Sequence, residues 1–230
     1  MRNGEVSYWW QARGAPPRRP SLPGGAEADV CIVGAGFTGL WTAYYLKRAD
    51  PGLRVVVLEA AFAGFGASGR NGGWVTAGLP GSRARYAQFM SGHQRGRAGV
   101  RELERHLRET VDEVARVCAA EGIDAGLVKG GTLTVATSAA QDARLRRQVE
   151  HERSWGDGPR IVRYLTKAEL DSRLHVTGVV GALYYPDCAR VQPAEIDVTL
   201  VDSYSRTPER VTASASPATR SAGCTRAQSG

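Results

Sequence analysis

The residues of this chain that could do chemistry form a glycine-rich turn, Gly34-Ala35-Gly36-Phe37-Thr38-Gly39, with the spacing G-x-G-x-x-G. Such a turn can hold a pyrophosphate, because its glycines let the backbone approach the phosphates and the free amides of the next helix face them. Glu59 follows Gly39 by twenty positions, where a carboxylate can accept hydrogen bonds from the hydroxyls of an adenosine ribose and would repel the 2′-phosphate of NADP. The pattern therefore predicts a site for an adenine dinucleotide, either FAD or NAD.

The residues around the turn predict the strand–helix–strand unit that such a site requires. Residues 29–33 form a short apolar run, which is typical of a parallel strand buried on both faces, and Cys31 within it is expected to be a small core residue. A helix is expected over about 40–46, and residues 53–58 form a second strand rich in β-branched side chains. These elements predict an α/β fold built on a Rossmann-like βαβ unit with a right-handed crossover.

A second run, Gly64–Gly69, has the same glycine spacing, and a chain with 28 glycines offers such matches by chance. Only the first run directly follows a predicted strand, opens a predicted helix and has an acidic residue at the right distance. The second run lies in a glycine-rich loop expected over residues 60–81. The phosphate-binding function is therefore assigned to Gly34–Gly39.

With these motifs in place, the sequence resembles the D-amino-acid-oxidase-like superfamily of FAD-dependent oxidoreductases, especially the branch that includes gamma-glutamylputrescine oxidase. The stretches that carry the resemblance are 28–46, 55–60 and 63–73, with weaker similarity at 132–135 and 188–193. The resemblance favours FAD over NAD as the cofactor.

The resemblance implies that the loop at Ala67–Gly73 passes beside the FAD diphosphate and reaches toward the isoalloxazine ring. Ser68 and Asn71 would donate or accept hydrogen bonds there, and Arg70 would neutralise anionic charge. The motif and the resemblance together assign cofactor binding to Gly34, Ala35, Gly36, Phe37, Thr38, Gly39, Glu59, Ala60, Ala67, Ser68, Arg70, Asn71, Gly72 and Gly73. No catalytic side chain is assigned, since the cofactor carries the difficult chemistry.

The reaction implied by the resemblance is the oxidation of a small-molecule amine or amino acid. The substrate would give a hydride to flavin N5 and become an imine, which water hydrolyses, and molecular oxygen would reoxidise the flavin to yield hydrogen peroxide. Two alternatives stay open from the residues alone. The first is a non-catalytic fragment with at most weak dinucleotide binding, and the second is an NAD-dependent dehydrogenase.

Along the chain, four regions are expected: an N-terminal arm at 1–27, the FAD-binding unit and glycine-rich loop at 28–81, a helical and mixed-sheet substrate-side region at 82–196, and a disordered tail at 197–230. The tail is expected to be disordered because, from Ser203 onward, Val211 is its single aliphatic side chain larger than alanine. Family members continue beyond the point where similarity fades near Asp197, so a truncated product with an incomplete substrate layer is predicted. In the arm, Tyr8-Trp9-Trp10 either anchors the chain or belongs to a loose terminus.

The substrate-side region contains patterns for several further elements. Apolar residues spaced by three or four from Val100 to Val117 predict a long helix, and a second helix is expected over 139–155. Residues 126–137, with Gly130-Gly131 at their centre, are interpreted as a β-hairpin. Thr166 with Glu169 forms a capping box, and residues 179–185 are expected to be a strand.

Composition argues against other classes of protein. The net charge of +7 comes from arginines that are spread along the chain beside acidic residues, which argues against a nucleic-acid surface. The four cysteines have no CxxC spacing, which argues against a metal site, and the four histidines are expected to be exposed. No signal-like segment and no long apolar run are found, so a cytoplasmic protein without a membrane partner is expected.

Overall fold

The computed structural model describes residues 6–22, 24–90, 96–205 and 211–214. Within these ranges the chain forms two compact units. The first contains the described residues within 1–73, 120–125 and 192–230, and the second contains those within 74–119 and 126–191. In the described ranges, no helix combines the length and the apolar character that crossing a membrane requires.

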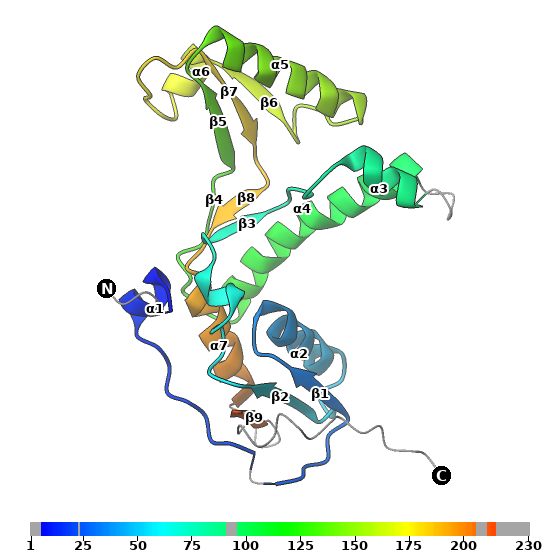
Figure 1. Ribbon diagram of the computed structural model, residues 1–230, viewed down its shortest axis with the longest axis vertical. Helices are drawn as coiled ribbons and strands as arrows, with labels where there is room; N and C mark the ends of the chain where they lie inside the picture. The colour runs from blue at the N-terminus through cyan, green and yellow to red at the C-terminus, as the bar shows by residue number, and fades with distance from the viewer. Residues whose placement is uncertain (1–5, 23, 91–95, 206–210, 215–230) are drawn as a thin grey trace. The chain divides into compact units, whose positions relative to one another are not determined.

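The first unit contains the βαβ unit that the sequence predicts, as Figure 1 shows. Its sheet has the order β1-β2-β9 and is parallel throughout. Val30 of β1 aligns with Val55 of β2, and Val56 of β2 aligns with Val211 of β9. The elements of this unit are α1 (Tyr8–Arg13), β1 (Val30–Val33), α2 (Phe37–Ala49), β2 (Val55–Glu59), the 3₁₀ turn η1 (Ala67–Arg70), α7 (Pro193–Ser205) and β9 (Val211–Ser214).

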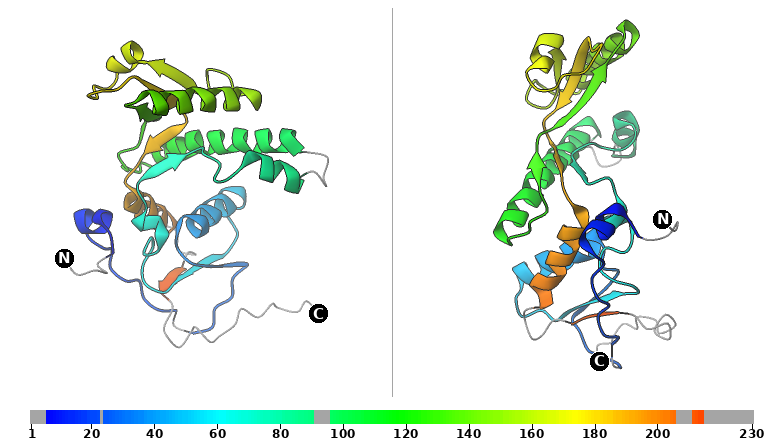
Figure 2. Two further views of the ribbon diagram at one scale, coloured as in Figure 1. Left: turned by 45° about the horizontal axis from the view of Figure 1, so that its top comes forward. Right: turned by 90° about the vertical axis from the view of Figure 1, so that its left-hand side faces the viewer.

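Only one face of this sheet is covered by helices in the described part of the chain. Helices α2 and α7 lie on the same side of the sheet (Figure 2), and α2 buries Leu40, Ala43 and Tyr44. Successive strand residues point to opposite faces, so Cys31 is exposed and Val33 is 81% exposed on the other side. The expectation that β1 is buried on both faces, with Cys31 in the core, is therefore wrong.

The N-terminal arm is anchored to the first unit, which decides between the two alternatives for its aromatic residues. Trp10 of α1 is only 3% exposed and packs with Ala194 and Val198 of α7. Its ring also meets Phe62 edge to face, with the ring centroids 5.1 Å apart. The apolar area that these residues bury gives the arm a fixed position.

The expected boundary at residue 197 is wrong, because α7 runs through it from Pro193 to Ser205. The helix is stabilised by the burial of its apolar side chains Ile196, Val198, Leu200 and Val201. Further along, Val211–Ser214 pair with β2 as β9, since the edge of β2 offers main-chain hydrogen bonds that do not depend on side-chain type. Residues 206–210 and 215–230 of the predicted tail lie outside the described residues.

The second unit contains two three-stranded antiparallel sheets, with the orders β3-β8-β4 and β5-β7-β6. Its long helix and the following one, expected at 100–117 and 139–155, are confirmed as α4 and α5. The elements are β3 (Trp74–Thr76), α3 (Arg83–Met90), α4 (Gly96–Ala120), β4 (Val128–Lys129), β5 (Thr132–Ala136), α5 (Ala139–Ser154), β6 (Arg163–Thr166), α6 (Lys167–Asp171), β7 (Gly181–Tyr185) and β8 (Cys188–Arg190).

The predicted hairpin at 126–137 is wrong. Strand β4 pairs with β8, and β5 pairs with β7, so the two strands belong to different sheets. Gly131, at a φ of +78°, turns the chain between them, and its amide donates to the carbonyl of Cys188 at 2.9 Å. Strands β7 and β8 therefore take the main-chain bonds that a hairpin would have used.

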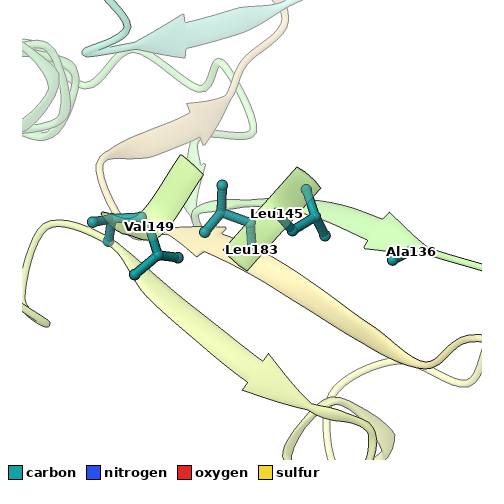
Figure 3. Close-up of a cluster of buried hydrophobic side chains, with 5 residues drawn as sticks. Ala136, Leu145, Val149 and Leu183 are labelled. Carbon is teal, nitrogen blue, oxygen red and sulfur yellow. The ribbon is translucent and has the colours of Figure 1, made fainter. Parts of the chain in front are cut away.

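Side chains from α5 and the β5-β7-β6 sheet form the core of the second unit. Figure 3 shows Leu145 and Val149 of α5 beside Leu183 of β7, with Ala136 at the end of β5. At the far edge of this sheet, the predicted capping box is confirmed, because Thr166 accepts from the amide of Glu169 and Glu169 accepts from the amide of Thr166.

Asp197 of α7 is fully buried, and neither of its carboxylate oxygens has a hydrogen-bond partner in the described part of the chain. Burial raises its pKa to about 8. The folded protein therefore holds this carboxyl protonated at neutral pH, whereas the unfolded chain ionises it. The free energy of unfolding should fall as pH rises from about 4 to about 8. At pH 7 this decrease should be on the order of 4 kcal/mol.

We therefore expect Asp197→Asn to raise the free energy of unfolding at pH 7 by a few kcal/mol, because a neutral amide does not lose a proton on unfolding. The gain should shrink toward pH 4. Urea denaturation at several pH values checks this, with Asp124→Asn as the control because Asp124 is exposed. An equal gain in the free energy of unfolding at pH 4 and at pH 8 would contradict the raised pKa of Asp197.

Candidate functional site

The glycine-rich turn joins β1 to α2 with the geometry that its sequence predicts. Gly34 has a φ of +102°, a left-handed conformation that favours glycine, and a Cβ added there would meet no atom within 4 Å. Gly36 is the N-cap residue of α2, and it has no side chain to cap the helix. The first amides of α2 and its partial positive charge therefore lie at the turn.

Gly39 is required by close packing against the main chain, and Gly36 lies against a side chain of the loop. A Cβ on Gly39 would lie 2.0 Å from the carbonyl oxygen of Gly34, and a Cβ on Gly36 would lie 2.8 Å from Oγ of Ser68. Real Cβ atoms do not approach main-chain oxygen this closely, so α2 can pack against the turn only with glycine at position 39.

Glu59, at the end of β2, lies against this turn. Its Oε2 accepts a hydrogen bond from the amide of Ala35, and its Oε1 accepts one from the amide of Ala61, both at 3.0 Å. Each carboxylate oxygen has a further lone pair, so the group can also accept hydrogen bonds from a ligand. The structure thus brings Glu59 to the turn, while its contact with a ribose stays a prediction.

The glycine-rich loop also reaches the start of α2. The hydroxyl of Ser68, in η1, accepts a hydrogen bond from the amide of Phe37 at 2.8 Å. Asn71 stabilises the loop from within, since its Oδ1 accepts from the amide of Gly73 at 2.8 Å and its Nδ2 donates to the carbonyl of Ser68. Ser68 is therefore the loop side chain that the structure brings to the predicted phosphate position.

Arg70 has a different environment from the one expected for a charge-neutralising group. Its Nε donates to the carbonyl of Phe65 at 2.6 Å, and its guanidinium lies 4.5 Å from the centre of the Phe65 ring. These contacts hold Arg70 within its own loop. Ala60, Ala67, Thr38 and Gly72 are exposed, and a Cβ on Gly72 would meet no atom within 4 Å.

The arm supports the loop through contacts that the sequence motifs do not predict. Oγ of Ser7 donates to the carbonyl of Gly69 at 2.6 Å, and Nε1 of Trp9 donates to the carbonyl of Asn71 at 2.8 Å. Gly69 itself lies against Trp10, because an added Cβ would be 2.3 Å from its Nε1. The one sign of this role in the sequence is the aromatic run at residues 8–10 of an otherwise polar arm.

These residues fit the dinucleotide that the motif predicts. The site offers free space beside Gly34 and Gly66, the amides at the start of α2, the hydroxyl of Ser68 that already accepts from one of them, and the carboxylate of Glu59. This donor set matches an adenine dinucleotide, whose phosphates need N–H and O–H donors and whose ribose hydroxyls need an acceptor.

The second unit has a separate cavity of about 500 Å³ that the sequence motifs do not identify. Arg83 of α3 lies at its wall and binds three buried carboxylates. Its Nε bonds Glu104, and its Nη2 lies 2.8 Å from Asp157. Its Nη1 is 2.6 Å from Oε2 of Glu152, an ion pair without hydrogen-bond geometry.

Tyr185 also lines this cavity, and its hydroxyl donates to Glu152 at 3.1 Å. Burial and the nearby Glu152 raise the pKa of Tyr185.

Three of the four histidines lie in the described part of the chain, and His151 among them borders the cavity of the second unit. His106, His151 and His175 are exposed, as expected, and His93 lies outside the described residues. Among the described residues, no group of three or more His, Cys, Asp or Glu side chains could hold a metal ion.

A family model described as "DAO: FAD dependent oxidoreductase" matches residues 29–205. The probable oxidoreductase OrdL of Haemophilus influenzae is 29% identical over 187 residues, which cover 81% of this chain and 41% of that protein. The gamma-glutamylputrescine oxidoreductase of Escherichia coli is 64% identical over 45 residues, which cover 20% of this chain and 10% of that protein.

Solved structures show the same fold. The crystal structure of glycine oxidase from Geobacillus kaustophilus matches with a TM-score of 0.53 and 26% identity, over 80% of this chain and 46% of that one. The chain thus spans less than half the length of these relatives.

The close approach at Gly39 leads to the next prediction. Gly39→Ala should lower the free energy of unfolding by about 1–3 kcal/mol, because the new methyl group would overlap the carbonyl of Gly34. Gly66→Ala is the matched control, since its Cβ would enter open space, and it should change stability by less than about 0.5 kcal/mol. Urea denaturation compares the two variants, and equal stabilities would contradict the packing described here.

Arg83 should be essential for the stability of the second unit. Arg83→Met should lower its free energy of unfolding by about 3–5 kcal/mol, because three buried carboxylates would lose their common counter-charge. Arg85→Met on the same helix removes an exposed guanidinium and should have little effect. Thermal and urea unfolding measure both variants, and similar losses in the two would refute the role given to Arg83.

Proposed function

Since the chain belongs to the family of FAD dependent oxidoreductases, as its motifs predict, we propose that it binds FAD between the turn at Gly34–Gly39 and the loop at Ala67–Gly73. The observation that carries this proposal is the meeting of three segments at the start of α2. Glu59, at the end of β2, accepts a hydrogen bond from the amide of Ala35 in the turn. Ser68, in the loop, accepts one from the amide of Phe37 at the start of α2.

Each of these residues has a role that follows from its position. The amides at the start of α2 would bind the pyrophosphate, and the hydroxyl of Ser68 would donate to a phosphate oxygen while it still accepts from Phe37. Glu59 would accept hydrogen bonds from the ribose hydroxyls. Asn71 holds the loop in shape, and the backbone of Gly72 and Gly73 would lie against the flat ring system.

When bound, FAD would accept a hydride from the substrate, and molecular oxygen would reoxidise the reduced flavin to give hydrogen peroxide. The proposed substrate is an amine or amino acid, because relatives of this chain are named for glycine and for gamma-glutamylputrescine. The proposed location is the cytoplasm. Since the chain spans 41% of the OrdL protein, the binding of FAD and the oxidation of substrate by this chain are both proposals to be tested.

Glu59→Gln tests the cofactor site. Glutamine has one acceptor oxygen, so it cannot bind the amides of Ala35 and Ala61 and a ribose hydroxyl as the carboxylate can. We expect the affinity for FAD to fall about tenfold or more, as measured by the quenching of flavin fluorescence on titration. Glu27→Gln is the matched control, because the side chain of Glu27 is 93% exposed.

Three outcomes would change the assignment. Equal FAD affinity in both variants would remove Glu59 from the site. Saturable binding of NAD without binding of FAD would favour the dehydrogenase alternative. An FAD-loaded chain that releases no hydrogen peroxide with any amine or amino acid would favour the non-catalytic alternative.

A further inference from the structure

The N-terminal arm holds two carbonyls of the loop at Ala67–Gly73. Ser7 donates from Oγ to the carbonyl of Gly69 at 2.6 Å, and Trp9 donates from Nε1 to the carbonyl of Asn71 at 2.8 Å. Both bonds connect residues that are 62 positions apart in the chain. The arm thus fixes the orientation of two peptide groups in the second half of the loop.

Helix α1, which provides these donors, is itself held in place. Ser7 is its N-cap residue, and Oγ accepts from the amide of Trp10 while it donates to the loop. Trp10 is buried against α7, and Gly69 lies so close to its ring that an added Cβ would be 2.3 Å from Nε1. Further along, the arm borders a cavity of about 650 Å³ beneath it, and the loop, which is described in full, does not line that cavity. The arm therefore acts on the loop through Ser7 and α1.

A carbonyl that is fixed also fixes the amide that follows it. The peptide group is planar and trans, so its N–H points away from its C=O. The carbonyl of Asn71 accepts from Trp9, so the N–H of Gly72 points away from the arm. Gly72 is exposed, an added Cβ there would meet no atom within 4 Å, and its amide has no hydrogen-bond partner in the described part of the chain. The loop thus presents a free donor to open space, and Trp9 sets its direction.

The polar groups beside this amide are already bonded within the loop. The amide of Gly73 donates to Oδ1 of Asn71, and Nε of Arg70 donates to the carbonyl of Phe65. The amide of Gly72 is therefore a donor that remains for a ligand. A flavin ring suits such a donor, because its ring nitrogens and carbonyl oxygens accept hydrogen bonds.

We propose that Ser7 and Trp9 are positioning residues for the flavin half of the cofactor, which hold the loop so that the amide of Gly72 donates to the flavin ring. This inference rests on the proposed function, because it takes the loop at 67–73 to be a wall of the FAD site. It adds to that function two residues of the arm that belong to no motif and that act through the loop. The adenosine half, at the turn Gly34–Gly39, should depend on them much less.

Titration of the full chain with FAD and with ADP tests this. Trp9→Phe removes the indole donor and keeps an aromatic ring on α1. It should bind FAD about fivefold more weakly, because the loop loses the bond that orients its free amide, and it should bind ADP within about twofold of the wild type. Tyr8→Phe is the matched control, since it removes a hydroxyl from the same helix at a residue that is 71% exposed.

A second readout follows the flavin ring directly. The visible absorption spectrum of bound FAD responds to hydrogen bonds at the ring. At saturating FAD this spectrum should shift in Trp9→Phe and stay unchanged in Tyr8→Phe, whereas a role in stability alone would lower the melting temperature without changing the spectrum. Ser7→Ala should also weaken the binding of FAD, and Ser7→Thr, which keeps a hydroxyl, should retain wild-type affinity.

The possible results separate this inference from the proposed function. Wild-type affinity for FAD with an unchanged flavin spectrum in Trp9→Phe would overturn the positioning role and leave the FAD site intact. Equal losses of affinity for FAD and for ADP would also overturn it, because the arm would then act on the fold as a whole. If the wild-type chain binds neither nucleotide, the proposed function fails, and this inference fails with it.

Discussion

Main-chain amides at the start of α2 need partners, and the way they obtain them organises the first unit. A helix leaves its first amides without bonds inside the helix, and Gly36 has no side chain to cap them. Ser68 accepts from Phe37, and Glu59 accepts from Ala35 in the turn just before the helix. These two bonds connect a loop and a strand end to one point, which is also the point where phosphates would bind.

The arm extends this arrangement to the N-terminal part of the chain. Ser7 and Trp9 bond to the carbonyls of Gly69 and Asn71, so the loop that provides Ser68 is itself supported from residues more than sixty positions away. In both of these bonds, a side chain of the arm donates to a main-chain carbonyl of the loop. In the second unit, Arg83 has a comparable structural function, because it joins α3 to carboxylates of α4 and α5.

Two features of the first unit oppose its stability. Asp197 lies fully buried on α7 against Gly64, with no hydrogen-bond partner among the described residues. Cys31 and Val33 are exposed on the sheet face opposite α2 and α7. Burying a carboxyl and exposing a β-branched side chain both cost free energy, so the unit relies on the apolar contacts of α2, α7 and Trp10.

The sequence by itself determined the features that depend on neighbouring residues. The spacing of Gly34, Gly36 and Gly39, with Glu59 after the second strand, predicted the turn and the strand–helix–strand unit, because each is a short-range pattern. The periodicity of α4 and the capping box at Thr166 are local in the same sense, and both were confirmed.

Tertiary structure alone decided which segments meet. The pairing of β4 and β5 with different strands, the exposed face of β1 and the docking of the arm on α7 all depend on contacts between residues far apart in the chain. Residue spacing carries no information about such contacts, since a strand edge accepts any partner whose backbone reaches it and an apolar surface accepts any side chain that fits. The ion pairs of Arg83 and the cavity beneath the arm follow from the same long-range packing.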